Sequence, residues 1–196
     1  MSDHAHRQIL WGDVPVPYAA AWSAEEGRFT IRTCEHTGRV CLLQTESRGE
    51  GKPVFGKPHN NRQREVVMRG LCDICAKSLK TCTKVSLSHV RPVETPQVVV
   101  VSQVEPLLHR RCAALSLRHC PSLRRDVRNG TLFVRQVTRY TVLLAELTPE
   151  AIAEFTGQTH HTRSGARHTG IYGHAKVALL DWRDRDEAWL RFAEAA

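Results

Sequence analysis

The sequence contains few aromatic residues and no long apolar run. Phe, Trp and Tyr make up 6% of the 196 residues, and none of them lies between Gly56 and Leu132. This gap disfavours a protein that stacks single-stranded bases on aromatic rings. The longest apolar runs, near 98–101 and 142–145, have the length of strands, whereas a membrane span needs about 20 residues. We therefore expect no membrane partner.

Other absences narrow the class of protein further. No charged segment followed by an apolar segment opens the chain, so we expect a cytoplasmic protein without an export signal. Walker, dinucleotide-binding and G-x-S-x-G motifs are all missing, so these enzyme classes have no support. The cysteine count is odd, at seven. In a chain without an export signal, that count favours thiolates and metal binding over disulfides.

Positive charge is abundant and unevenly distributed. The formal net charge is +8, and residues 59–140 hold 15 Lys and Arg against 5 Asp and Glu. The rest of the chain holds 13 against 15. A basic region of this kind predicts a polyanionic partner, nucleic acid first and an acidic protein surface second. A charged face that only keeps the protein in solution is the alternative.

The residue pattern predicts an α+β fold, which we divide into three parts or read as one compact domain. Residues 1–62 form an N-terminal β-hairpin region with a long loop, residues 63–130 a zinc module, and residues 131–196 a C-terminal β/α extension packed on it. Several elements are expected from period-two alternation, prolines and capping residues. They are an irregular lead-in at 1–27 with one short helix at 18–26, a hairpin of strands 28–34 and 39–43, a loop at 45–62, a short helix or strand at 63–70, a hairpin of strands 83–89 and 96–104, a helix after Pro106 that ends at Pro121, strands at 131–137 and 140–145, a helix from Thr148 to Gly157, a mobile basic loop at 160–169, a strand at 173–182, and a last helix capped by Asp184 or Asp186.

Two ligand pairs with metal-site spacing dominate the middle of the chain. Cys72-x-x-Cys75 is followed, after 33 residues, by His109-x-x-Cys112. Soft donors in two x-x pairs can share one tetrahedral ion at about 2.0–2.3 Å, so we predict a structural Zn²⁺ that supplies much of the local folding free energy. Cys82, His119 or Cys120 are alternatives to His109 as a ligand. Buried thiols with a core histidine are the competing interpretation, and the lack of a βαβ pattern argues against a redox pair.

The turn that carries Cys72 and Cys75, which we call the knuckle, is followed by a predicted hairpin and then by a helix. This order is that of a treble clef, and the residues in it resemble a known family. Ser88-His89-Val90-Arg91-Pro92 resembles the Asp-His-x-x-Pro motif of HNH endonucleases, and 107–112 resembles their second knuckle. The resemblance implies a ββα-metal module with His89 as the general base. Ser88 and Ala113 stand where that family places its catalytic metal ligands, and Glu105 or His119 would have to substitute. We therefore expect a degenerate, non-catalytic module, with an HNH-type nuclease as the alternative.

Six arginines on and after the predicted metal-bound helix are candidates for phosphate binding. They are Arg110, Arg111, Arg118, Arg124, Arg125 and Arg128. A helix N-terminus beside arginines suits phosphate, so we expect docking on the backbone of duplex DNA with little sequence selectivity. The alternative is a protein-interaction regulator or inhibitor, of the phage or accessory type, that uses the same basic face.

Two further groups of metal-type side chains have simpler interpretations. Cys34 and Cys41 would be cross-strand neighbours near His36, and we read them as buried small side chains rather than a second metal site. The histidines at 160, 161, 168 and 174 are read as part of a solvated loop rather than as a cluster.

Overall fold

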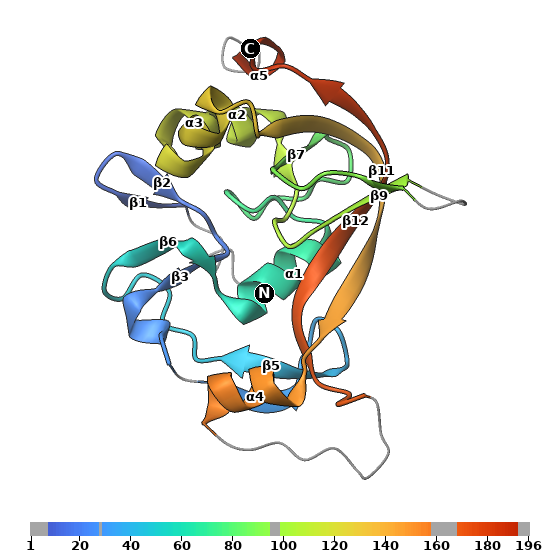
Figure 1. Ribbon diagram of the computed structural model, residues 1–196. Coiled ribbons are helices and arrows are strands. Elements are labelled where there is room, and N and C mark those ends of the chain that lie inside the picture. The colour runs from blue at the N-terminus through green and yellow to red at the C-terminus, as the bar shows by residue number, and fades with distance from the viewer. Residues whose placement is uncertain (1–7, 28, 95–98, 158–167, 192–196) are drawn as a thin grey trace.

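The computed structural model describes residues 8–27, 29–94, 99–157 and 168–191, which form a mixed α+β fold (Figure 1). The strands are β1 (Ile9–Trp11), β2 (Val14–Val16), β3 (Ala20–Trp22), β4 (Phe29–Thr33), β5 (Val40–Gln44), β6 (Pro53–Pro58), β7 (Lys84–Ser88), β8 (Val93–Glu94), β9 (Val99–Gln103), β10 (Leu108–His109), β11 (Phe133–Glu146) and β12 (Tyr172–Arg185). The helices are α1 (Asn60–Arg69), α2 (Arg110–His119), α3 (Pro121–Arg128), α4 (Pro149–Thr156) and α5 (Glu187–Arg191), with a 3₁₀ turn at Ser23–Glu25. No helix in these ranges is long and apolar enough to cross a bilayer.

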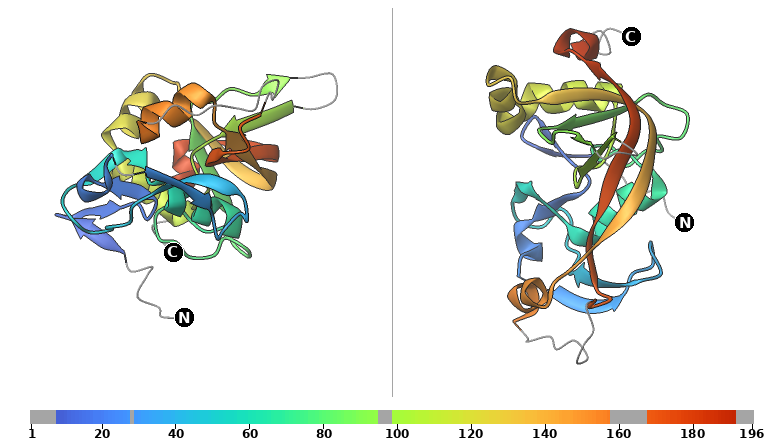
Figure 2. Two further views of the ribbon diagram at one scale, coloured as in Figure 1. Left: turned by 90° about the horizontal axis from the view of Figure 1, so that it is seen from below. Right: turned by 45° about the vertical axis from the view of Figure 1, so that its right-hand side comes forward.

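A long antiparallel hairpin, β11 with β12, is the frame of the molecule. Each strand has 14 residues, so the hairpin is roughly 46 Å long and runs from α2, α3 and α5 at one end to α4 at the other (Figure 2). The main sheet has the order β10-β7-β11-β12-β5-β4. We predicted two strands where β11 is one. A register shift between Val137 and Arg139 bends it, and Thr138 bonds across to Asp181, so the strand continues through the bulge.

The strand predicted at 83–89 is β7, and the part of the strand predicted at 96–104 that lies in the described residues contains β9, but the two do not form the hairpin that we expected. β7 pairs with β10 and β11, whereas β9 pairs with β8 and β12. Side chains still connect them, because the hydroxyl of Ser86 lies 2.5 Å from Oε1 of Gln103. Alternation identifies a strand but not its partner, and the long hairpin offers both strands more backbone to pair with.

Three N-terminal expectations were wrong. The lead-in contains the ribbon β1–β2, in which Pro15 faces Leu10, because an edge ribbon tolerates a residue without an N–H. The expected helix at 18–26 is β3 followed by the 3₁₀ turn. The expected loop at 45–62 contains β6, which pairs with β3, and the first turn of α1.

Several other elements were predicted correctly from local signals. β4 and β5 form the expected hairpin. Thr148 caps α4 by accepting a hydrogen bond from the N–H of Ala151, and Gly157 ends that helix in the left-handed conformation at φ 68°. Asp186 caps α5 by accepting from the N–H of Trp189. α2 ends before Pro121 as expected, but Pro121 then begins the unpredicted α3.

α1 is unusual because its polar side chains are buried in the centre of the fold. Arg62 donates to the carbonyls of Tyr18 and Ala20, and it forms a two-pronged ion pair with Glu25. Gln63 bonds both the N–H and the carbonyl of Ala175 in β12. These bonds satisfy buried backbone groups of the N-terminal segment and of β12, so α1 ties these two parts of the chain together.

The three predicted parts contribute to one continuous core. It joins Tyr18, Leu79, Val101 and Val177 with the fully buried Cys72. Leu79 belongs to the knuckle region, Val101 to β9 and Val177 to β12. The predicted zinc site therefore lies against the edge of the main core.

Candidate metal centre

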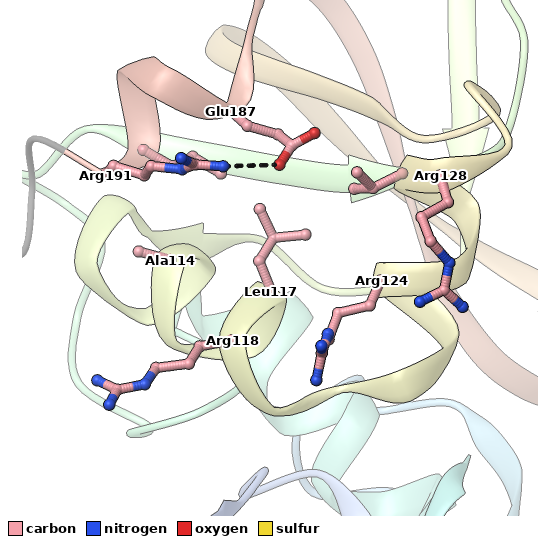
Figure 3. A pocket seen from close by; sticks show the side chains of 9 residues that line it. Ala114, Leu117, Arg118, Arg124, Arg128, Glu187 and Arg191 are labelled. Carbon is pink, nitrogen blue, oxygen red and sulfur yellow. Dashed lines mark ion pairs between the residues drawn. The ribbon is translucent and has the colours of Figure 1, made fainter.

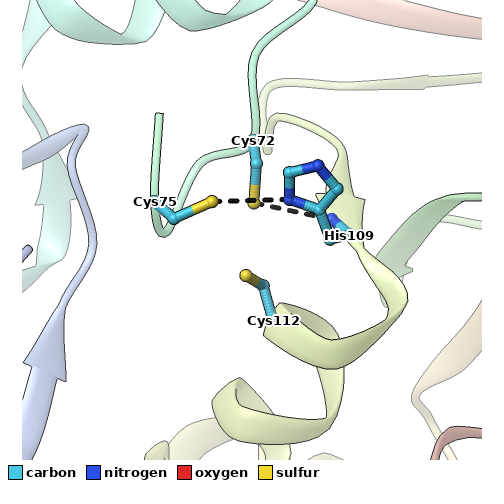
Figure 4. A group of neighbouring side chains, drawn as sticks. All are labelled: Cys72, Cys75, His109 and Cys112. Atoms are coloured by element: carbon cyan, nitrogen blue, oxygen red, sulfur yellow. Dashed lines mark hydrogen bonds between the residues drawn. The ribbon is translucent and has the colours of Figure 1, made fainter. Parts of the chain in front are cut away.

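The four predicted zinc ligands come together. One ligand atom from each of Cys72, Cys75, His109 and Cys112 lies within 4.8 Å of the others (Figure 4). Cys72 and Cys75 lie on the knuckle after α1, His109 ends β10, and Cys112 lies on the first turn of α2. Segments 33 residues apart in sequence thus bring their donors to one point.

Backbone hydrogen bonds explain why the knuckle presents both thiols on one side. The N–H of Cys72 donates to the carbonyl of Lys77 at 2.9 Å, and the N–H of Ala76 donates to the carbonyl of Cys72 at 2.8 Å. Ala76 adopts a left-handed φ of 51°, which turns the chain tightly after Cys75. The bridge between Leu71 and Ser78 closes the turn.

His109 is oriented so that one ring nitrogen faces the thiols. Its Nε2 lies 3.1 Å from the carbonyl oxygen of Ser78, which can only accept a hydrogen bond, so Nε2 is the donor. Its Nδ1 is left with a lone pair and lies 3.4 Å from Sγ of Cys75. A carbonyl that fixes the tautomer in this way is a regular companion of metal-binding histidines.

The thiols are electrostatically coupled. Hydrogen bonds from the thiols of Cys112 and Cys72 lower the pKa of Cys75 below its ordinary value, whereas hydrogen bonds with Cys72 and Cys75 raise the pKa of Cys112. The N–H of His109 also points at Sγ of Cys72, at 3.5 Å. Contacts of this kind favour ionisation of Cys75, and a metal cation would bind the three cysteines as thiolates.

The donor set and its spacing fit a tetrahedral ion such as Zn²⁺. With metal–ligand distances near 2.0–2.3 Å, nitrogen and sulfur ligands lie about 3.6 Å apart. The observed distance of 3.4 Å between His109 and Cys75 is close to that value. The alternative ligands Cys82, His119 and Cys120 do not belong to the group. His109 is therefore the fourth member of the cluster, as predicted.

The predicted arginines lie around the two helices that follow the cluster. Five of the six are exposed: Arg111 and Arg118 on α2, and Arg124, Arg125 and Arg128 on α3. We call these five the α2–α3 arginine surface. Arg111 and Arg118 are seven positions apart, so they lie on the same side of α2, about 20° from each other.

Arg110, the sixth, is engaged elsewhere. Its guanidinium lies over the ring of Trp189, 4.4 Å from the centroid, and donates to the carbonyl of Trp189 through Nε and Nη2. It therefore joins the end of α2 that carries Cys112 to α5. Neither Trp189 nor Ser78 was singled out from the sequence, because their partners lie 79 and 31 residues away along the chain.

His89 lies on an exposed turn after β7. It lines a pocket of about 480 Å³ that Arg91, Arg125 and Asp126 also line. The buried Arg135 supports this turn, since its Nη2 donates to the carbonyl of Val90 at 2.8 Å. Ser88 and Ala113, at the degenerate positions, are both buried.

The two other groups of metal-type side chains form no cluster in the described ranges. Cys34 and Cys41 are buried as predicted, but Arg32 rather than Cys34 is the strand partner of Cys41. Cys34 lies opposite Arg39 instead and donates from its N–H to the Arg39 carbonyl at 2.8 Å, across the loop of residues 35–38.

Of the four C-terminal histidines, residues 160 and 161 lie outside the described ranges. So does most of the predicted mobile basic loop at 160–169. His168 pairs with Glu146 at 2.9 Å on the surface. Burial and the nearby Arg64 lower the pKa of His174 to about 4.

Comparison with protein-family models, with curated proteins and with solved structures returned no match to this chain. Its function therefore has to be inferred from its own residues and their geometry.

Proposed function

We propose that this protein is a non-catalytic, zinc-binding module that docks on nucleic acid. In this proposal its fold is of the treble-clef type and resembles that of HNH proteins. The contact surface in this proposal is the α2–α3 arginine surface, and the partner is the phosphate backbone of duplex DNA. The observation that carries the proposal is the exposure of five arginines on α2 and α3, where the first turn of α2 holds the candidate metal ligand Cys112.

The donor set supports zinc in a structural role. Three thiol sulfurs and one imidazole nitrogen are the soft ligands that zinc takes in closed, four-coordinate sites. Four protein ligands leave no open position for water or substrate, so such an ion stabilises the fold and performs no chemistry. The ion would tie the knuckle to α2 and so fix the direction of the arginine surface.

The chain order supports the treble-clef assignment. A knuckle at 71–78 precedes strands β7 to β9, and β10 with α2 then brings the second ligand pair. Most of the module's strand pairing is with the C-terminal hairpin. In this proposal the C-terminal extension thus takes the place of the hairpin that a small zinc module usually contains.

Charge supports a phosphate partner. The α2–α3 arginine surface contributes five positive charges, and Asp126 is the acidic residue that α2 and α3 carry among them. Arginine binds phosphate through a planar fork, and each neutralised phosphate releases counterions. Binding should therefore be strong at low salt and largely independent of sequence.

Fluorescence anisotropy of the zinc-loaded protein with a random 20-bp duplex, titrated across salt, tests this proposal. We expect log K to fall with log salt at a slope of about −4 to −5, since each phosphate contact contributes about −0.9. Arg111→Ala with Arg118→Ala should reduce both affinity and slope. The matched control is Arg32→Ala with Arg39→Ala, two exposed arginines on the β4–β5 hairpin at the α4 end of the molecule (Figure 1). Absence of binding at low salt would overturn the proposal.

An acidic protein partner is the second candidate. Apolar side chains that lie beside the arginines favour it. Leu117, Val127 and Leu190 line a pocket of about 410 Å³ between α2, α3 and α5. Apolar side chains at the centre of a charged rim are typical of protein interfaces. Co-purification of an acidic protein, with no affinity for the duplex, would favour this candidate.

A further inference from the structure

α3 lies on the surface, and the side chains of its residues are exposed or half-buried. It has eight residues and none of them is buried, but Leu123 packs against the core. Successive residues advance by about 100° around a helix. Arg124, Arg125 and Arg128 therefore point away from Leu123, on the outer half of α3. Arg124 and Arg128 lie on one flank of this outer half and Arg125 lies on the other.

The first flank borders the pocket of about 410 Å³ described above. Arg118, Arg124 and Arg128 lie along one side of it, and the Glu187–Arg191 ion pair lies on the opposite side (Figure 3). Because Arg191 is paired with Glu187 at 3.6 Å, the three arginines of α2 and α3 carry the net charge here.

The second flank borders the pocket of about 480 Å³ that His89 also lines. Arg91 enters it from the turn after β7 and Arg125 enters it from α3. Both are exposed. Asp126, half-buried, is the acidic residue in its wall, and the hydroxyl of Ser122, which accepts a hydrogen bond from Arg125, can donate to a phosphate oxygen. α3 thus has a basic pocket on each side.

We propose that α3 enters the major groove of duplex DNA and that each flanking pocket receives the backbone of one strand. The inference rests on the proposed function and specifies its geometry. A helix with its side chains is about 10–12 Å wide and the major groove is about 12 Å wide, so a helix in the groove has a backbone on each side. α3 is about 12 Å long, so a short stretch of the groove accommodates it lengthwise between the two backbones.

A single strand does not explain both pockets. One sugar–phosphate backbone fills one groove, and nonspecific single-strand sites add aromatic rings on which bases stack. Phe133 is the aromatic residue among the lining of the two pockets, and it is covered on one face by Arg135, whose guanidinium carbon lies 4.5 Å from the ring centroid. Two basic walls on either side of an exposed helix match two strands.

The test compares three double variants on two probes. One pair removes the first flank, Arg124→Ala with Arg128→Ala, and another removes the second flank, Arg91→Ala with Arg125→Ala. Arg32→Ala with Arg39→Ala is the control of equal charge. Each is titrated by anisotropy across salt against a 20-bp duplex and against one of its strands alone. Circular dichroism and zinc content confirm that the variants are folded.

We expect each flank variant to lose at least tenfold in duplex affinity and to reduce the salt slope by about 2, with the control unchanged. On the single strand, we expect only one flank variant to weaken binding. If wild type binds the duplex and only one flank matters, the groove geometry is wrong while nucleic-acid docking stands. The groove geometry would also be overturned if both flank variants weakened binding to the single strand as much as they weakened binding to the duplex. If wild type binds poly-glutamate but not the duplex, the proposed function fails as well.

Discussion

The guanidinium of Arg110 lies 4.4 Å from the centre of the Trp189 ring and donates to the Trp189 carbonyl. Arg185 contacts the same ring from β12, at 5.4 Å. The first residue of the metal-site helix is thereby locked to the last helix of the described chain. Arg110 and Arg111 look equivalent in the sequence, but Arg110 stabilises the fold and Arg111 faces solvent.

Arg110→Ala should therefore lower stability, whereas Arg111→Ala should not. Loss of the charged hydrogen bonds and of the cation–π contact is expected to cost about 2–3 kcal/mol. Urea unfolding of both variants measures this difference. Equal stability of the two variants would show that Arg110 is not a structural contact.

Cys75→Ser should abolish zinc binding and unfold at least residues 71–121, because the binding free energy of the ion supplies much of the local folding free energy. Cys82→Ser is the matched control, since Cys82 is exposed and lies outside the cluster. Zinc content per protein and near-ultraviolet circular dichroism are the measurements. A folded Cys75→Ser protein with full zinc would remove the site.

Glu25→Ala should be strongly destabilising, by about 3–5 kcal/mol, because it leaves the buried guanidinium of Arg62 without its charge partner. The neighbouring Glu26→Ala serves as control. Glu26 pairs with Lys57 on the surface, a contact expected to contribute about 0–1 kcal/mol. Thermal unfolding of the two variants separates a buried ion pair from an exposed one, and similar losses would contradict the burial of Glu25.

The contribution of His174 to stability should fall as the pH decreases from 6.5 to 4, against an opposite contribution from Asp73, whose pKa burial raises to about 7. Burial lowers the pKa of His174 to about 4 in the folded state, against 6.5 for an ordinary histidine. Above pH 6.5 both states are neutral and stability is complete. Below it the unfolded state binds the proton first, so roughly 3 kcal/mol is lost by pH 4.

Urea unfolding at pH 7, 5.5 and 4.5 measures this loss, and His174→Gln should flatten the dependence. His59 is buried as well, with a pKa lowered by burial and by Arg62, so a residual slope of the same sign is expected in that variant. An unchanged slope in His174→Gln would assign the whole effect to other groups.

The resemblance to HNH nucleases leads to a separate prediction for His89. With Ser88 and Ala113 in place of metal ligands, we expect no nicking of plasmid DNA in Mg²⁺ or Mn²⁺. His89→Ala should leave the fold and zinc content unchanged, since the side chain is exposed. Nicking by wild type that is lost in His89→Ala would establish the nuclease instead.

The sequence by itself determined those features that depend on neighbours along the chain. The x-x spacing of Cys72 and Cys75 makes a tight turn, and their match with 109–112 was enough to predict the four-residue cluster. Thr148 and Gly157 marked the ends of α4, because caps act within one turn of a helix. Alternation located β4, β5, β7, β9 and most of β12.

Tertiary structure alone decided which segments became partners. β7 and β9 pair with the long hairpin rather than with each other. The polar side chains of α1 form hydrogen bonds with buried carbonyls that are far away along the chain. The arginines after Pro121 were placed on two flanks of α3 by the packing of Leu123. Local pattern sets the type of an element, but its partner depends on the free energy of burying it against residues that are distant in sequence.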